Sequence, residues 1–120
     1  MNRPSPCINN HQGVLPAESL QGNLIGGARN SFWLAPMAGI TDVCFRQLMD
    51  EMGAGVLVSE LVSAKGLLYN SEKTHKMIEV HAKPKSLVGI QLFGEMEEDI
   101  INAAHYVKEA GAAFVDINLG

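Results

Sequence analysis

A chain of 120 residues with 47% hydrophobic and 18% charged residues has the composition of one small soluble domain, which excludes a wholly disordered chain. The formal net charge of −4 argues against a nucleic-acid binder that works through overall charge. Cys7 and Cys44, the two cysteines, form no CxxC pair and indicate neither a disulfide framework nor a metal site. No run approaches the roughly 20 apolar residues that span a bilayer, so we expect a cytoplasmic protein without a membrane partner.

Residues 1–30 are rich in Asn, Gly, Gln, Ser and Pro and show no sustained apolar periodicity. We therefore predict a flexible lead-in over residues 1–30 and a folded domain over residues 31–120. The folded part opens with a continuous apolar run over residues 31–35, which predicts a strand buried on both faces of a parallel sheet. The run breaks off at Pro36 and Gly39, before a helical pattern begins.

Thr41 or Asp42 can cap the helix that follows, and Gly53 is its expected end. The apolar residues of this helix recur at helical spacing and form its predicted packing face: Phe45, Leu48, Met49 and Met52. The other face carries Arg46 and Asp50. The pattern therefore predicts an amphipathic helix with its charged residues turned away from the sheet.

Two further apolar runs, over residues 55–59 and 86–92, predict the second and third strands. Between them, residues 61–81 predict a loop followed by one or two short helices. Glu60 follows the second strand, where a salt bridge to a lysine or to Arg46 ranks above a contact with a ligand. The histidines of the region and of the next helix have no partner at a suitable spacing and are predicted to be surface groups: His75, His81 and His105.

The helix after the third strand is the clearest in the chain. Acidic residues cluster at its start, Lys108 lies near its end, and Gly111 is its expected stop. Its predicted buried stripe consists of Met96, Ile100, Ala103, Ala104 and Val107. Residues 113–118 then predict a fourth strand.

The predicted strand ends at Pro36, Glu60, Gln91 and Asn118 lie roughly 24 to 31 residues apart. About 250 residues make eight βα units in a TIM barrel, or ~30 residues a unit. The sequence therefore predicts an α/β fold, namely the N-terminal half of a TIM (β/α)8 barrel with about four βα units. A doubly wound open sheet has similar spacing and is the alternative, although no GxGxxG follows the first strand.

In a barrel, chemistry gathers at the carboxyl ends of the strands. There, Met37, Ala38 and Gly39 allow the main chain to approach a planar cofactor closely and offer amides that can bond its heteroatoms, while Pro36 stiffens the turn. The alternative is that this turn only ends a strand. Gln91 offers a donor and an acceptor that suit the edge of a flavin or a base, or it is a hydrogen-bonded glutamine of the barrel rim. Asn118 has the same two functions.

Asp116 lies two residues before Asn118 and points to the same side of the strand. A buried aspartate needs partners, so a structural hydrogen bond is its predicted role. Five of the six lysines fall between residues 65 and 85, opposed by Glu72 and Glu79. This cluster is either a solvated face or a surface for a partner.

Six short motifs, taken together and in order, resemble the start of a tRNA-dihydrouridine synthase. They are LAPMAGITD at 34–42, FR at 45–46, GAG at 53–55, SE at 59–60, QLFG at 91–94 and DINLG at 116–120. The resemblance covers the chain from about residue 33 to its last residue. It implies a TIM-barrel flavoprotein that binds FMN, is reduced by NADPH, and passes a hydride to C6 of a tRNA uracil while an acid protonates C5.

By position, the resemblance implies that Pro36, Met37 and Ala38 line the flavin through the main chain and that Gln91 bonds its ring. Asn118 would lie between the flavin and the target uridine. tRNA is the implied partner, and its uracil must leave the base stack, so the lysines of residues 65–85 become candidates for RNA contact. The uridine position and the set of tRNAs are not implied.

In the family, the last motif continues with a cysteine that donates the proton, and that cysteine would directly follow Gly120. No catalytic residue is therefore assigned within the chain, and no metal ligands are expected. We expect a truncated synthase that is inactive alone and self-associates through the unpaired edges of a half-barrel. The alternatives are another FMN-dependent barrel, such as a dihydroorotate dehydrogenase-like enzyme, and a non-enzymatic half-barrel remnant.

Overall fold

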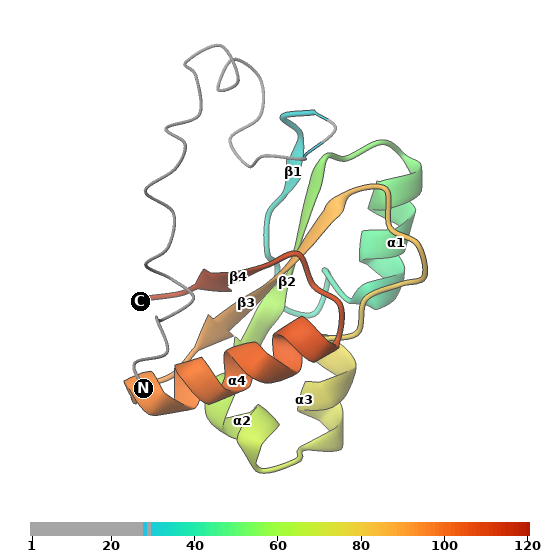
Figure 1. The fold of residues 1–120 in the computed structure, drawn as a ribbon. Coiled ribbons are helices and arrows are strands. Elements are labelled where there is room, and N and C mark those ends of the chain that lie inside the picture. Colours follow the sequence, from blue (N-terminus) through green and yellow to red (C-terminus); the bar gives the residue numbers. More distant parts are fainter. Residues whose placement is uncertain (1–27, 29) are drawn as a thin grey trace, which may run out of the picture.

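The computed structural model describes Ala28 and residues 30–120, so the predicted flexible lead-in lies almost wholly outside the described residues. The described chain forms one parallel sheet and a set of helices (Figure 1). The strands are β1 (Trp33–Leu34), β2 (Val56–Ser63), β3 (Leu87–Phe93) and β4 (Phe114–Ile117). The helices are α1 (Val43–Glu51), α2 (Ala64–Leu68), α3 (Glu72–Met77) and α4 (Glu97–Glu109).

The order of the strands in the sheet is β1-β2-β3-β4, and every neighbouring pair is parallel. Each strand thus lies beside its predecessor in the sequence, with a helical crossover between them. A doubly wound sheet would instead reverse its strand order at a switch point. The sequential order is that of consecutive βα units in a barrel, so the predicted half-barrel fold is confirmed and the open-sheet alternative is wrong.

One face of the sheet packs against the helices. Its core joins residues of β2, β3, α2 and α4 that are almost completely buried: Val62, Ile90, Leu92, Leu67, Ala103 and Val107. The predicted stripe of α4 is confirmed at Ala103 and Val107, whereas Met96 is 62% exposed at the helix start. Burying a large apolar side chain contributes about 1.5–3 kcal/mol, so this layer holds the helices on the sheet.

The other face of the sheet has a smaller cluster, in which Ala28, Val56 and Val58 are buried. Here the ring of Phe114 lies over Gly89, its register partner on β3. A Cβ at position 89 would stand only 2.2 Å from two ring carbons, so glycine is the residue that leaves room for the ring. This is the face that turns toward the interior in a closed barrel.

Helix α1 buries a face that only partly matches the one its pattern predicts. Asp42 caps it as predicted, since its Oδ1 accepts a hydrogen bond from the amide of Phe45 at 2.8 Å. Its two buried residues, however, are Arg46 and Asp50, whereas Leu48 is 49% exposed. The predicted packing face is therefore right for the half-buried Phe45 and Met49 and wrong for the exposed Leu48 and Met52. Hydrogen bonds with the backbone offset the cost of burying the two charges.

Asp50 receives its hydrogen bonds from the connector that precedes β3. Its carboxylate accepts from the amides of Lys85 at 3.0 Å and Ser86 at 2.8 Å, and from the Ser86 hydroxyl. His81 lies 3.1 Å from the second oxygen, and its side chain is only 6% exposed. The prediction that His81 is a surface group is therefore wrong. Together these contacts tie the end of α1 to the start of β3.

The strand bounds differ from those predicted at both ends of the first βαβ unit. Strand β1 contains only Trp33 and Leu34, and β2 continues through Ser63 instead of ending at residue 59. An irregularity in the β2–β3 pairing, between Val58 and Leu61, lets the strand continue past its polar residues. Two short helices follow, as predicted, but no loop precedes them.

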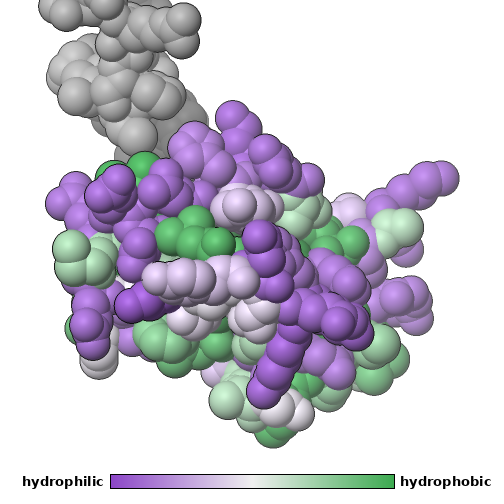
Figure 2. All heavy atoms as spheres, turned by 90° about the horizontal axis from the view of Figure 1, so that it is seen from below, coloured by the Kyte–Doolittle hydropathy of each residue, from purple (hydrophilic) through white to green (hydrophobic). Residues whose placement is uncertain are grey.

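Seen from below, the side of the molecule that carries α2, α3 and α4 is largely hydrophilic, with separate apolar patches (Figure 2). Among Ala28 and residues 30–120, no helix has both the length and the apolar character needed to cross a membrane.

Candidate functional site

The residues predicted to bind ligand lie at or just after strand ends on the same edge of the sheet, because parallel strands point their carboxyl ends in one direction. The turn with Pro36, Met37 and Ala38 follows β1, Gln91 lies near the end of β3, and Asn118 follows β4. Hydrogen bonds link neighbouring strand ends at this edge.

The turn after β1 is closed by its own hydrogen bonds. The amide of Met37 donates to Thr41 Oγ1 at 3.0 Å, and the amides of Ile40 and Thr41 donate to the Met37 carbonyl oxygen at 3.1 and 3.0 Å. Gly39 adopts a φ of 74°, a left-handed conformation that favours glycine. Within the described residues, the amide of Ala38 has no acceptor, and Ala38 is exposed. The turn therefore offers one free main-chain N–H at its surface.

Arg46 of α1 holds this turn by a hydrogen bond to its last residue, Thr41. Its guanidinium is completely buried and donates to the carbonyl oxygens of Thr41 and Glu79, both at 2.6 Å. Burial lowers the pKa of Arg46, while the carboxylates of Asp42, Glu60 and Glu79 act in the opposite direction. An arginine keeps its charge over the physiological range even so. The buried cation thus joins the β1–α1 turn to the connector after α3.

Glu60 reaches the turn from β2. Its Oε1 accepts a hydrogen bond from the amide of Gly39 at 2.5 Å. The ranking that put a salt bridge to a lysine or Arg46 first is therefore wrong, since Arg46 donates to carbonyl oxygens instead. The sequence signal for this contact is the polar pair Ser59–Glu60 inside an otherwise apolar strand, which sequence reasoning took for the end of the strand.

Gln91 is held by the strand beside it. Its Nε2 donates to Asp116 Oδ2 at 2.6 Å, and these two residues are register partners in the β3–β4 pair. The structural hydrogen bond predicted for Asp116 is confirmed. In the part of the chain that the structure describes, nothing donates to Gln91 Oε1, so the amide keeps a free acceptor while its other end is fixed.

Asn118 continues from β4 into a hollow of about 660 Å³ at the carboxyl ends of β3 and β4. Its main-chain amide donates to the Leu92 carbonyl oxygen at 2.9 Å, and its side-chain Oδ1 accepts from the main-chain amide of Gly120 at 2.9 Å. Apolar side chains from three strand ends share the hollow: Leu61, Phe93, Ile117 and Leu119. An apolar hollow with a few polar groups is the usual form of a small-molecule site.

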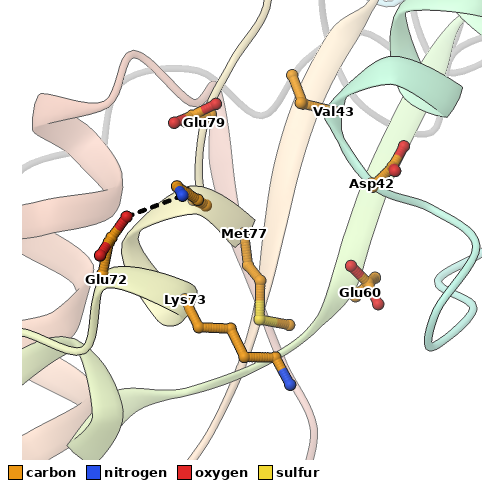
Figure 3. A pocket seen from close by; sticks show the side chains of 8 residues that line it. Asp42, Val43, Glu60, Glu72, Lys73, Met77 and Glu79 are labelled. Carbon is orange, nitrogen blue, oxygen red and sulfur yellow. Dashed lines mark ion pairs between the residues drawn. The ribbon is translucent and has the colours of Figure 1, made fainter.

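A second hollow, of about 620 Å³, lies beside the turn, between the start of α1 and α3 (Figure 3). Asp42 and Glu60 line one side, and Lys73 and Met77 from α3 line the other. Within residues 28 and 30–120, no group of three or more His, Cys, Asp or Glu side chains is placed to hold a metal ion.

The lysines predicted as one cluster occupy two edges of the sheet. Lys65 on α2 follows the carboxyl end of β2, where its Nζ lies 5.9 Å from the centre of the Tyr69 ring. Lys76 pairs with Glu72 on α3 at 2.8 Å. Lys73 also lies on α3, whereas Lys83 and Lys85 precede the amino end of β3 and are thus near the opposite edge. The five lysines therefore do not form one continuous face.

Sequential parallel βα units in this order form the first half of a (β/α)8 barrel. Residues 33–120 match the family model described as "Dihydrouridine synthase (Dus)". The chain belongs to the dihydrouridine synthase family. This assignment confirms the resemblance that the motifs indicate, and it favours that family over a dihydroorotate dehydrogenase-like barrel.

Curated relatives agree with the family match. The chain is 40% identical over 92 residues to tRNA-dihydrouridine synthase B of Klebsiella pneumoniae and of Escherichia coli (strain K12), a match that covers 77% of this chain and 28% of each relative. It is 43% identical over 94 residues to tRNA-dihydrouridine synthase B of Pseudomonas putida, covering 77% of this chain and 27% of the relative. The chain thus spans little more than a quarter of the length of these relatives.

Proposed function

We propose that this chain supplies part of the active site of a tRNA-dihydrouridine synthase, an enzyme that uses FMN and NADPH to reduce uridine in tRNA to 5,6-dihydrouridine. The observation that carries this proposal is the family match over residues 33–120, which includes the turn after β1 and the ends of β3 and β4. The curated relatives named above are tRNA-dihydrouridine synthases B.

The free groups of the site fit a flavin. The polar edge of the flavin ring system carries both acceptors and a donor, and the described residues offer it the free N–H of Ala38 and the free Oε1 of Gln91. Pro36 and the partly exposed Met37 complete the turn that would line the cofactor. We therefore assign FMN binding to Pro36, Met37, Ala38 and Gln91.

Bound FMN would supply hydride transfer from NADPH to C6 of the uracil. In the proposed site, the side-chain oxygen Oε1 of Gln91 orients the flavin ring. Asp116 accepts a hydrogen bond from Nε2 of the same side chain and so keeps the Gln91 side-chain amide from rotating. Asn118, in the hollow at the end of β4, would bind the uracil. Protonation of C5 is assigned to no residue of this chain.

The proposed macromolecular partner is tRNA, which also makes the cytoplasm the proposed location. A uracil in a folded tRNA is stacked, so it has to leave the stack before it can reach a buried cofactor. The apolar hollow around Asn118 has the character that an unstacked base requires, since bases bind by stacking and by hydrogen bonds to their edges.

The activity test is a chimera in which residues 33–120 replace the matching segment of Escherichia coli tRNA-dihydrouridine synthase B. It is produced in a strain whose tRNA lacks dihydrouridine, and the nucleosides of digested tRNA are measured by mass spectrometry. We expect dihydrouridine to return and FMN to co-purify with the chimera. A soluble chimera that does neither would contradict the proposal.

A second chimera carries Asn118→Ala and tests the proposed role of Asn118. This variant should still retain FMN but lose at least about tenfold in the rate of dihydrouridine formation, because it lacks one substrate hydrogen bond of about 1.5 kcal/mol. Equal loss of FMN and of activity would instead assign Asn118 to the cofactor.

A further inference from the structure

Strand β2 contains a bulge that places Glu60. Val58 pairs with Gly89 on β3, but the next pairs join Leu61 to Gln91, so β2 uses one residue more than β3 over the same length. An extra residue leaves a gap in the ladder of main-chain hydrogen bonds. Ser59 fills that gap, because its Oγ accepts from the amide of Gln91 at 3.0 Å.

The serine is suited to this place in two ways. It is completely buried, so an unsatisfied amide on Gln91 would be costly there. Its hydroxyl also donates to the Glu60 carbonyl oxygen at 2.8 Å, which fixes the backbone of the bulge. The bulge is thus a stable feature of β2 and not a frayed strand end.

The bulge moves Glu60 out of the pairing register with β3, and its carboxylate bonds the amide of Gly39 in the turn after β1. This contact spans 21 positions of the sequence and joins two strand ends. With Gly39 occupied, and the amides at positions 37, 40 and 41 bonded inside the turn, Ala38 keeps the one free N–H of residues 37–41. Glu60 therefore occupies the amide of Gly39 and leaves the amide of Ala38 free to bind a ligand.

We propose that Glu60 is a positioning residue, which acts through Gly39 to hold the turn so that the Ala38 amide can bind the flavin. The proposal rests on the proposed function, because it concerns the same cofactor. A glutamine at position 60 keeps the acceptor oxygen and should preserve the contact, whereas alanine removes it. Glu79, an exposed carboxylate that lines the same hollow, provides the matched control (Figure 3).

The test uses the ¹⁵N-labelled 120-residue chain and its Glu60→Ala, Glu60→Gln and Glu79→Ala variants. Without ligand, hydrogen exchange of the Gly39 amide should be slow in the wild type, in Glu60→Gln and in Glu79→Ala, and at least about tenfold faster in Glu60→Ala. NMR titration with FMN, which detects millimolar affinities, should then show a Kd about fivefold weaker in Glu60→Ala, the value of one hydrogen bond. Glu60→Gln should stay within about twofold of the wild type.

Three results would overturn the proposal. Equal exchange of the Gly39 amide in the wild type and in Glu60→Ala would show that the contact with Glu60 does not form in solution. Faster exchange in Glu60→Ala with an unchanged FMN affinity would show that Glu60 has no positioning role. If wild type binds no FMN at millimolar concentration, the flavin part of the proposed function fails as well, while the exchange data still test the contact itself. Should Glu60→Ala not fold, Glu60→Thr, which suits a strand but cannot reach Gly39, replaces it.

Discussion

Arg46 and Asp50 lie one turn apart on α1, and both charged side chains are buried against the connector that leads to β3. Arg46 donates to the carbonyl oxygen of Glu79 at the start of that connector, and Asp50 accepts from the amide of Ser86 at its end. One helix face thus fixes both ends of a segment without secondary structure. Since parallel strands need long crossovers, such a segment must be held for β3 to keep its register.

Removing the Asp50 carboxylate should destabilise the fold. Asp50→Ala removes the carboxylate that accepts hydrogen bonds from the amides of Lys85 and Ser86, so we expect a loss of about 3 kcal/mol in the free energy of unfolding. Urea unfolding followed by circular dichroism measures this loss. Glu51→Ala, an exposed carboxylate on the same helix, is the control and should change the stability by less than about 0.5 kcal/mol. Equal losses in both variants would contradict this account.

The same carboxylate gives a pH dependence of known sign. Burial alone raises the pKa of Asp50, but hydrogen bonds from Ser86, Lys85 and His81 outweigh it and hold the pKa well below its usual range. A depressed pKa in the folded state adds stability above the unfolded value of about 3.9, and this contribution is lost as the pH falls below that value.

We therefore expect the stability difference between the wild type and Asp50→Asn to shrink as the pH falls from about 4 to about 2. Urea unfolding of both proteins at a series of pH values measures it, and taking the difference removes the contribution of the other carboxylates. A difference that grows on acidification would show that the folded-state pKa of Asp50 is not depressed.

The sequence predicted the sheet well because its signals are local. Continuous apolar runs set the four strands, Asp42 and Gly53 set the ends of α1, and the spacing set the βα repeat. It failed on Arg46 and Asp50 of α1, because periodicity treats a charged residue as solvated. The main-chain groups that these side chains bond at Glu79 and Ser86 lie more than 30 positions away in the sequence. Burial of these charges depends on tertiary partners alone.

The site was predicted unevenly for a related reason. The positions of Gln91 and Asn118 near strand ends could be predicted, as could the hydrogen bond of Asp116 from its need for a partner. The contact between Glu60 and Gly39 could not be predicted, because it depends on a bulge, and a bulge is visible only when two strands are paired. Ser59 is the one local hint, as a hydroxyl in a strand of apolar residues.

Asp116 should matter to the site through Gln91. In the chimera, Asp116→Ala frees the amide of Gln91 to rotate, so we expect FMN to bind about fivefold more weakly, which corresponds to about 1 kcal/mol. Asp116→Asn keeps an oxygen that can accept from Gln91 Nε2 and should stay near the wild-type affinity. Quenching of flavin fluorescence measures both. Similar affinity in all three proteins would mean that Gln91 needs no support.

Gly89 and Phe114 should prove to be energetically coupled. Gly89→Ala places a methyl group into the Phe114 ring, and we expect a loss of about 1–3 kcal/mol from overpacking. Phe114→Leu alone removes ring contacts, but in the double variant it also makes room for the methyl group. Urea unfolding of the four proteins gives the coupling energy, and the double variant should be more stable than the sum of the single losses predicts. Additive losses would contradict the proposed packing.

The lysines at the two edges of the sheet should differ in their effect on tRNA binding. If the carboxyl edge faces the RNA, as the proposed function requires, replacing Lys65 and Lys73 by alanine in the chimera should weaken tRNA binding severalfold and reduce its salt dependence. The control replaces Lys83 and Lys85, which precede the amino end of β3 and should leave the affinity within about twofold. Filter binding at several salt concentrations measures both effects. A larger loss from the control pair would place the RNA at the opposite edge of the sheet.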